Sequence, residues 1–194
     1  MEKKIKILYV MSSLRLCNGI TTYAMNYFRN IDRNKIQMDF LILDDEKTEY
    51  FDEIISEGSK IYYIPKLSSK NIFAHVHKLK TFLKEHSGEY DIVHCHMLNY
   101  GAIFMYYAKK YKYPTRIIHS HVTKSSDKLL RKIRNDIMIN FAIHYSNEYF
   151  ACSDDAGKSM FKERKFHVIK NAINCEKFLY NSELRKKMRK ELNL

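Results

Sequence analysis

The sequence predicts an α/β fold, in which a doubly wound, mainly parallel sheet carries helices on both faces. Short apolar runs rich in β-branched residues alternate along the chain with longer amphipathic segments, and this alternation is typical of parallel βαβ units. The apolar runs are continuous, as strands covered on both faces require. With 194 residues, the chain is long enough for one well-packed domain and too short for two large ones.

The first half of the chain contains three predicted strand–helix pairs. Apolar runs bounded by charge predict strands at residues 4–11, 36–43 and 60–64, and Pro65 ends the last of them. Apolar residues three and four positions apart predict helices at residues 19–31, 46–57 and 71–86. We expect Gly58 to stop the second helix, because glycine readily adopts the left-handed conformation that ends helices.

The second half continues the same alternation. Strands are expected at residues 91–96, 115–120, 148–152 and 167–170, and helices at residues 99–111, 127–145 and 154–163. Ser153 is the expected N-cap of the helix at 154–163. The last predicted element is a charged helix at residues 182–192, with Ser182 as its candidate N-cap.

The net charge of +12 implies an anionic partner, such as nucleic acid, anionic lipid or a phosphorylated substrate. Basic residues gather in two clusters, which the solvated face of a helix explains equally well. The clusters are Lys124, Lys128, Arg131, Lys132 and Arg134, and Arg185, Lys186, Lys187, Arg189 and Lys190.

Other bulk features exclude several protein classes. No apolar run approaches the ~20 residues of a membrane helix, and the first residues do not form a secretory signal, so a cytoplasmic protein is expected. The widely spaced Cys17, Cys95, Cys152 and Cys175 predict free, buried thiols rather than a zinc site or disulfides.

Ligands of doubly wound sheets bind at the carboxyl ends of the strands. The first loop there ends in Asn18-Gly19-Ile20. A glycine at a helix start lets backbone N–H groups approach an anion. A dinucleotide-binding loop needs three spaced glycines, however, and this loop has one. Taken alone, Gly19 is more simply interpreted as a tight turn.

Two neighbouring strands each end in a pair of histidines. Side chains two residues apart on a strand share a face, so His94 lies with His96 and His119 with His121. Four histidines at adjacent strand ends predict a binding site. They are candidates for metal ligands, for hydrogen-bonding groups to a polar substrate, or for packed rings. A metal is the less favoured alternative, because nothing in the spacing enforces a tetrahedral set.

The segment from Cys152 to Ser159 imitates a phosphate-binding loop. The pattern requires a glycine where Cys152 stands, so we interpret the segment as an ordinary helix start. Asp154 and Asp155 then complement the helix dipole. Magnesium binding by these aspartates, or by Asp44 and Asp45, is less favoured.

Together the motifs resemble the family-4 retaining glycosyltransferases of GT-B architecture, of the bacterial capsule and exopolysaccharide type. Five matches follow the family's order over essentially the whole chain. They are the glycine-rich first loop at residues 18–20, the DIVHxH strand at 91–96, the IxHSH strand at 117–121, the strand at 150–153 and the VIxNGIDxxxF segment at 168–178. The chain departs from the family at Asn18, Ala172 and Asn174, where the family has glycine, glycine and aspartate.

The resemblance implies that the chain is an N-terminal half. Residues 1–170 are the expected Rossmann-like, acceptor-side domain, and residues 171–194 the start of an interdomain linker with a charged terminal helix. The donor domain of such enzymes, with its paired glutamates, is not among these residues. We therefore expect a fragment or one subunit of a split enzyme, inactive by itself.

The full enzyme implied by the resemblance transfers a sugar from a nucleotide diphosphate to a polysaccharide or lipid-linked acceptor, with retention and without a catalytic metal. By the same resemblance, Asn18 and Gly19 face the donor diphosphate, as oriented N–H groups favour. His121 is the catalytic candidate and hydrogen-bonds the transferred sugar. The acceptor-side or supporting candidates are His96, Asn99, His119 and Lys124, the last of which meets an acceptor phosphate.

Two further alternatives concern partners. The basic stretch at residues 124–134, which continues into Ile137, Met138, Ile139 and Phe141, predicts peripheral contact with the anionic inner face of a membrane. In the competing interpretation, the apolar side chains pack on the sheet and the charges face water.

A non-catalytic acceptor- or anion-binding subunit is the second interpretation of function. Nucleic-acid binding is disfavoured, since no recognised motif occurs.

Overall fold

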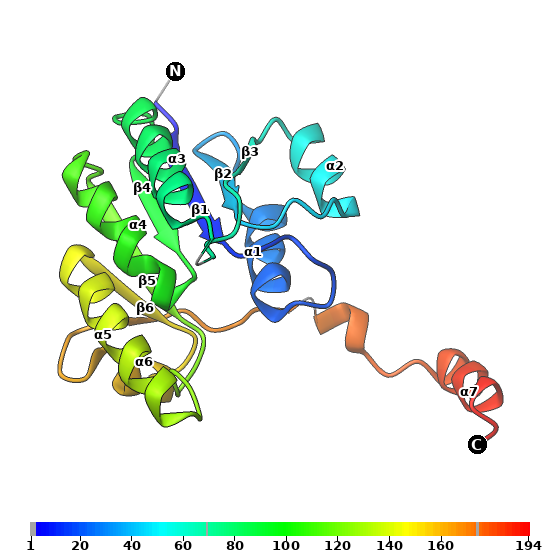
Figure 1. The fold of residues 1–194 in the computed structure, drawn as a ribbon. Coiled ribbons are helices and arrows are strands. Elements are labelled where there is room, and N and C mark those ends of the chain that lie inside the picture. Colours follow the sequence, from blue (N-terminus) through cyan, green and yellow to red (C-terminus); the bar gives the residue numbers. More distant parts are fainter. Residues whose placement is uncertain (1–2, 69, 174) are drawn as a thin grey trace.

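The computed structural model describes residues 3–68, 70–173 and 175–194, and its core is a seven-stranded parallel sheet (Figure 1). The strands are β1 (Ile5–Met11), β2 (Ile36–Ile42), β3 (Ile61–Tyr63), β4 (Ile92–Cys95), β5 (Thr115–Ser120), β6 (Glu148–Ala151) and β7 (His167–Val168). Their order across the sheet is β3-β2-β1-β4-β5-β6-β7. The chain thus winds outward from β1 and then, in the other direction, from β4, which confirms the predicted fold class.

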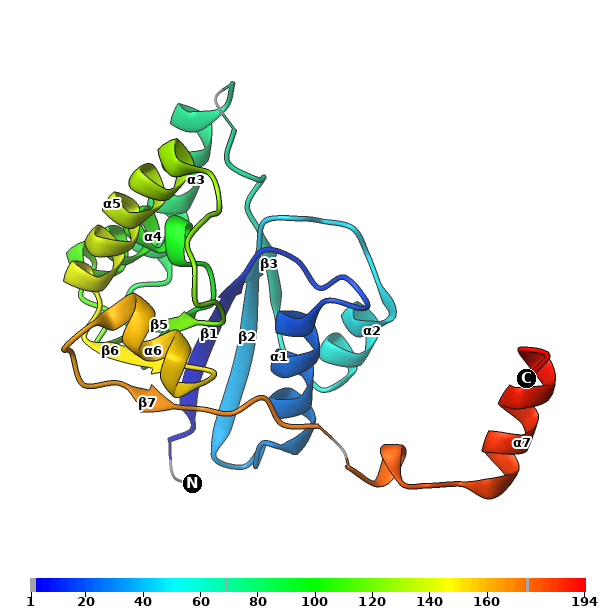
Figure 2. The ribbon, with the colours of Figure 1, turned by 90° about the horizontal axis from the view of Figure 1, so that it is seen from below.

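Helices cover both faces of the sheet (Figure 2). One face carries α1 (Gly19–Asn30) and α2 (Glu49–Ser56), and the other carries α3 (Ile72–Glu85), α4 (Leu98–Lys110), α5 (Leu129–Tyr145) and α6 (Asp154–Phe161). Helix α2 begins three residues later than expected. The preceding acidic residues are engaged elsewhere, because the Arg15 guanidinium pairs with Asp44 at 2.8 Å and with Glu46 at 2.7 Å.

The side chains of β1 show why its apolar run is continuous. Leu8 and Val10 point into the core beneath α3–α6, whereas Tyr9 and Met11 point into the core beneath α1 and α2. All four are buried. Successive side chains of a strand alternate between its faces, so a strand covered on both faces needs apolar residues at every position.

A glycine sets the close packing of α4 on its neighbours. A Cβ on Gly101 would lie 2.7 Å from Ile118 Cδ1 and 3.1 Å from Ala142 Cβ. The missing side chain therefore lets α4 approach both β5 and α5. Ala142 belongs to the buried face of α5.

The predicted ends of two helices are confirmed and one is wrong. Gly58 adopts φ +76° after α2, as a helix stop requires, and the Ser153 hydroxyl accepts a hydrogen bond from Ala156 N at 3.2 Å. Ser182 is not the cap of α7 (Ser182–Glu191). Asn181 takes that place and accepts from Leu184 N at 2.9 Å, because it is the residue whose backbone is extended.

The segment after β7 crosses the edge of α1 before it leaves the body. The Asn26 side-chain amide donates to Ala172 O at 2.7 Å, and the Tyr27 hydroxyl to Lys170 O at 3.4 Å. The 3₁₀ helix η1 (Cys175–Phe178) follows, and α7 lies away from the sheet in both views (Figures 1 and 2). Asn174 lies outside the described residues. The division of the chain at residue 170 stays a prediction.

The prediction for the thiols is partly wrong. All four cysteines are free, and Cys95 is buried, but Cys17, in the turn before α1, and Cys175, at the start of η1, are exposed. Among the described residues, the helices include none with the combined length and apolar character needed to span a bilayer.

Candidate functional site

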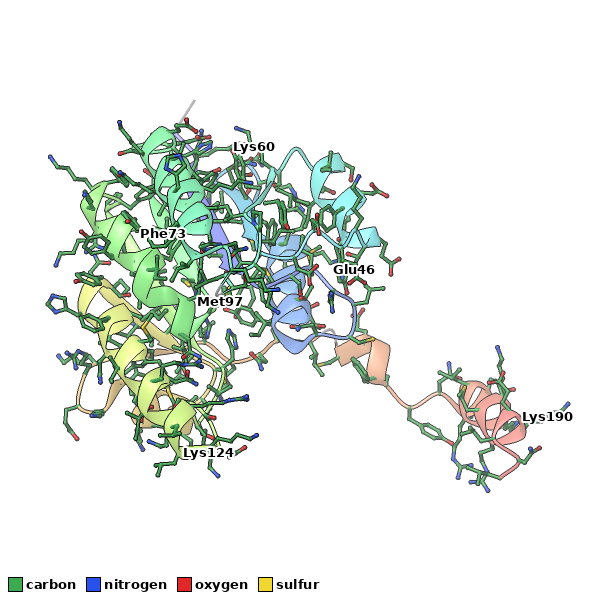
Figure 3. The ribbon with its side chains drawn as sticks, in the orientation of Figure 1. Glu46, Lys60, Phe73, Met97, Lys124 and Lys190 are labelled. Carbon is green, nitrogen blue, oxygen red and sulfur yellow. The ribbon has the colours of Figure 1, made fainter. Side chains whose placement is uncertain are left out.

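Two neighbouring cavities open at the carboxyl edge of the sheet. The histidine cavity, of about 280 Å³, is lined by His96, Asn99, His121 and Lys124 together with Ile20 of α1. The large cavity, of about 560 Å³, lies between the loops after β1 and β3 and the helices α4 and α5. Met97 and Asn99 line both cavities, and Met97 lies near the middle of the body of the protein in Figure 3. The structure therefore brings together four of the predicted site residues.

The four histidines at the ends of β4 and β5 form a single packed array. The two rings of each pair lie face to face, with centroids 4.2 Å apart. The His119 and His121 rings are stacked, and the His94 and His96 rings are tilted by 31°. Between the strands the rings are hydrogen-bonded. His94 Nε2 lies 3.0 Å from His119 Nδ1, and His96 Nδ1 lies 2.9 Å from His121 Nε2. The array confirms that each pair shares a face.

Two tyrosines close the array on the side of β1 and α1. The Tyr9 ring lies 4.7 Å from the His94 ring and 4.9 Å from the His96 ring. Tyr23 of α1 meets His96, His119 and His121 with centroid distances of 5.3 to 5.6 Å. The imidazoles are thus packed among aromatic rings, with His94, His96 and His119 buried and His121 half-buried.

Burial keeps this array uncharged at neutral pH. Loss of solvation lowers the pKa of His94 to about 3 and that of His121 to about 4. The pKa values of His96 and His119 are also lowered well below the usual range, first by burial and then by the neighbouring imidazoles. His121 is therefore a neutral hydrogen-bonding group rather than a cation.

The array distinguishes a ligand-facing layer from a supporting layer. His96 and His121 line the histidine cavity, whereas His119 is fully buried and, with His94, lies outside its wall. Because His96 occupies Nε2 of His121, the Nδ1 atom of His121 remains for a ligand. His119 is thus placed to support His121 rather than to touch an acceptor.

The first turn of α1 forms another wall of this edge. The Asn18 side-chain oxygen accepts from the backbone N–H groups of Ile20 at 3.0 Å and Thr21 at 3.2 Å, so Asn18 is the N-cap. A Cβ on Gly19 would meet no atom within 4 Å. Space is therefore open at Gly19, and the fold itself does not require glycine there. Donor binding by Asn18 and Gly19 stays a prediction.

Lys124 lies at the outer rim of the histidine cavity, at the lower edge of Figure 3. Its ammonium is 3.9 Å from the carboxylate of Asp127, and both side chains are highly exposed. Such an exposed pair is weak, so Lys124 is free to turn toward an anion.

Three of the histidines have the geometry for metal coordination. His94, His96 and His119 each offer a ring nitrogen, and these nitrogens lie within 4.8 Å of one another. Nε2 of His96 and Nε2 of His119 are buried without a hydrogen-bond partner among the described residues. The hydrogen bonds between the strands use other nitrogens of the same rings. The expectation of a metal-free site stays a prediction.

The segment that imitates a phosphate loop has a packing role. A Cβ on Gly157 would overlap the ring of Phe166, so this glycine makes room for an aromatic side chain that packs against the core. The side chain of Ser153 caps α6, whose first turn contains Asp154 and Asp155. This accounts for the segment without phosphate.

Sequence reasoning missed Arg15 and Lys66 in the large cavity, and it named Arg134 only as part of a basic cluster. Arg15, Lys66 and Arg134 line this cavity, together with an apolar wall that includes Leu67, Tyr100 and Met138. Arg15 and Lys66 could have been found from their position in loops at strand carboxyl ends. The place of Arg134 in this cavity could not have been found from the sequence, because it depends on how α5 packs beside α4.

Comparison with known proteins gives a consistent result. The family model described as Glycosyltransferase Family 4 matches residues 17–177. EpsF of Bacillus subtilis (strain 168) is 28% identical over 185 residues, which cover 92% of this chain and 48% of EpsF. The chain thus spans about half the length of this curated relative.

Two solved structures share the fold. The chain is 14% identical to Anabaena HepE, solved in complex with UDP and glucose, with a TM-score of 0.68 over 97% of this chain and 50% of HepE. It is 18% identical to a glycosyltransferase from Rickettsia africae ESF-5, with a TM-score of 0.67 over 99% of this chain and 50% of that protein.

Proposed function

The chain belongs to Glycosyltransferase Family 4, and from this premise we propose that it is the acceptor-side domain of a retaining sugar transferase. The enzyme transfers a sugar from a nucleotide diphosphate to a saccharide or lipid-linked acceptor, as in capsule or exopolysaccharide synthesis. The observation that carries this proposal is the histidine cavity, where His96, His121 and Asn99 meet the first turn of α1. Such a constellation at the carboxyl edge suits a polar, uncharged ligand part such as a sugar.

In this proposal the donor diphosphate approaches α1 at Gly19. The helix N-terminus favours negative charge, and the open space at Gly19 allows close approach. Asn18 already occupies two N–H groups of the turn, so its role is to fix the turn that faces the donor. The UDP and glucose bound to HepE support a nucleotide-sugar donor for this chain too.

The transferred sugar is proposed to bind at His121. A neutral imidazole cannot balance the charge of the diphosphate, but it can hydrogen-bond a sugar hydroxyl. His96 holds His121 Nε2 and thereby orients Nδ1 toward the cavity. His94 and His119, which are bonded to each other, pack against this pair on the side away from the cavity.

The acceptor is proposed to enter from the large cavity. Its wall combines apolar side chains with the cations of Lys66 and Arg134. Among the described residues, no ion pair engages either cation. An acceptor with both an apolar part and a phosphate fits this lining, and Lys124 at the second cavity offers a further contact for phosphate.

The nucleotide itself requires a second domain in this proposal. The solved relatives and EpsF are about twice as long as this chain, which supports a donor-binding half on the same polypeptide or on a partner. The alternative function is a non-catalytic, acceptor- or anion-binding subunit that completes a separate donor domain.

Product analysis tests the proposal. The native polypeptide that contains this chain is incubated with isotopically labelled nucleotide sugars and with a lipid and saccharide extract of its source cells. A new glycoside with the donor's anomeric configuration, identified by mass spectrometry and NMR, supports retaining transfer. An inverted product removes the retaining mechanism, and acceptor capture without any transfer favours the binding subunit.

Substitution of Gly19 tests the donor approach. Gly19→Val is expected to leave the thermal unfolding midpoint nearly unchanged, because a Cβ there meets no atom within 4 Å. The added side chain obstructs the proposed diphosphate path, so KM for the donor should rise by about tenfold or more. Gly58→Ala is the contrasting control, since its φ of +76° makes it a stability variant without a donor effect. An unchanged donor KM in Gly19→Val would contradict the assignment.

Chelation tests the absence of a catalytic metal. The proposed chemistry uses helix N–H groups and neutral imidazoles, so turnover should be unchanged after dialysis against EDTA. Elemental analysis before and after dialysis checks that any metal has been removed. Activity that is lost with EDTA and restored by zinc would instead indicate that His94, His96 and His119 bind a metal ion that transfer requires.

A further inference from the structure

Helix α5 exposes a continuous apolar stripe. Leu129, Ile133, Ile137 and Phe141 are spaced by four residues, so they lie along one side of the helix. They are 72%, 51%, 52% and 50% exposed. The buried face of the same helix is a different one, with Asn135, Ile139, Ala142 and Ile143. The interpretation in which the apolar residues pack on the sheet is therefore wrong for Ile137 and Phe141.

The first two turns of α5 project from the body of the protein. Every residue from Lys128 to Arg134 is exposed, and Leu130 reaches 82%. Exposed leucines are ordinary when they are scattered singly, but this end concentrates Leu129, Leu130 and Ile133 within five residues. These side chains lie on the exposed N-terminal end of the helix and line neither the large cavity nor the histidine cavity.

The charges on the first two turns of this stripe are all positive. The run from Lys128 to Arg134 contains four cations and no acidic residue. Lys132 pairs with Asp136 at 2.7 Å, but Lys128 and Arg131 form no ion pair with the described residues. The net charge of +12 adds a long-range attraction to any anionic surface.

The stripe adjoins the cavities of the proposed site. Arg134 and Met138 line the large cavity, and Ile139 of the same helix lines the histidine cavity. A shallow groove of about 310 Å³ continues the apolar surface along Met138, Phe141 and Tyr145 toward α4. A surface that engages α5 would therefore lie next to both cavity mouths.

We propose that this face of α5 docks on an anionic lipid membrane. Leu129, Leu130 and Ile133 enter the boundary between headgroups and acyl chains, and Lys128, Arg131 and Lys132 contact lipid phosphates. An amphipathic helix with leucines on one side and cations beside them is the pattern of interfacial membrane helices. The inference concerns binding and does not require that the chain transfer sugar.

Charge complementarity favours a membrane over a second copy of this chain as the partner of this face. A second copy of this chain would bring the same cations against one another, because a symmetric interface apposes identical surfaces. A membrane with anionic lipids instead supplies a continuous sheet of negative charge above an apolar layer. Self-association is accordingly an outcome of the test, not part of the proposal.

Vesicle sedimentation of the 194-residue chain tests the docking surface. Vesicles of phosphatidylcholine alone are compared with vesicles that also contain phosphatidylglycerol, at low and high salt. One variant is Leu129→Ser with Leu130→Ser, and a second is Lys128→Gln with Arg131→Gln. One matched control is Ile55→Ser, at an exposed apolar residue of α2. The other is Lys110→Gln with Lys112→Gln, at and just after the C-terminal end of α4. Lys186→Gln with Lys190→Gln tests α7 separately.

Binding is expected only to the phosphatidylglycerol vesicles. The charge variant should weaken it by about fivefold for each cation removed, and the serine variant by about tenfold. The controls should bind as the unmodified chain does. Circular dichroism should show both variants folded, since all four positions are exposed.

Three results would overturn the proposal. The first is equal binding by the α5 variants, and the second is loss of binding in the α7 variant alone. The third is a dimer, seen by light scattering without lipid, that the serine variant dissociates. Failure of any sugar transfer leaves the vesicle result unaffected, so the two proposals fail separately.

Discussion

Replacing His121 with alanine is expected to lower the turnover of sugar transfer by about 100-fold or more, with a smaller change in KM for the donor. Loss of a single oriented hydrogen-bonding group in a transfer site commonly has an effect of this size. The neutral imidazole is fixed by His96 at Nε2 and by the ring of Tyr23, so its Nδ1 atom has a defined direction. Steady-state kinetics of the enzyme that contains this chain would measure the loss.

Two amide substitutions separate the roles of the ring nitrogens. His121→Asn keeps a polar group near the position of Nδ1, and His121→Gln keeps one near Nε2, where His96 bonds. We expect the asparagine variant to retain more activity than the glutamine variant. His144→Ala, at an exposed position near the end of α5, is the control and should be unaffected. Equal activity of unmodified and His121→Ala enzymes would remove His121 from the mechanism.

Acid is expected to unfold this domain at an unusually high pH. Burial lowers the pKa of each histidine in the array, so the folded state keeps them neutral while the unfolded state binds protons below about pH 6.5. The ionisation penalty is absent above that pH and grows as the pH falls toward 4 and 3, the values for His121 and His94. Each histidine then costs about 1.4 kcal/mol of unfolding free energy per pH unit.

Urea unfolding between pH 7.5 and 5 measures this dependence. Carboxylates with lowered pKa values, such as Asp91 and Glu53, titrate below this window and do not contribute. In the double variant His94→Gln with His119→Asn, an amide pair keeps the cross-strand hydrogen bond but cannot ionise, so the slope should fall by about half. His77→Asn, on the exposed side of α3, is the control. A free energy of unfolding that stays flat down to pH 5 would contradict the assignment.

The sequence predicted the sheet and the histidine pairs because both depend on local periodicity. Continuous apolar runs marked buried strands, and spacing by two put His94 with His96 and His119 with His121. The sheet order then joined the pairs, since β4 and β5 are neighbours. The neutral state of the array follows from its burial, which only the packing of Tyr9 and Tyr23 reveals.

Other features depend on tertiary packing that periodicity does not encode. Helix α5 has apolar residues on two sides, and only its packing against α4, with Ala142 close to Gly101, shows which side is buried. The large cavity gathers Arg15, Lys66 and Arg134 from three separate segments. The predicted start of α2 was too early, because Arg15 in the loop after β1 pairs with Asp44 and Glu46 in the loop after β2.

The central claim is that this carboxyl edge is a site of sugar transfer. The most direct test follows release of nucleoside diphosphate by ³¹P NMR, with and without acceptor extract, for a panel of nucleotide sugars and for the unmodified and His121→Ala enzymes. We predict that one donor is consumed, that acceptor accelerates its consumption, and that His121→Ala abolishes the acceleration. Consumption of no donor, or equal acceptor-dependent release by both enzymes, would contradict it.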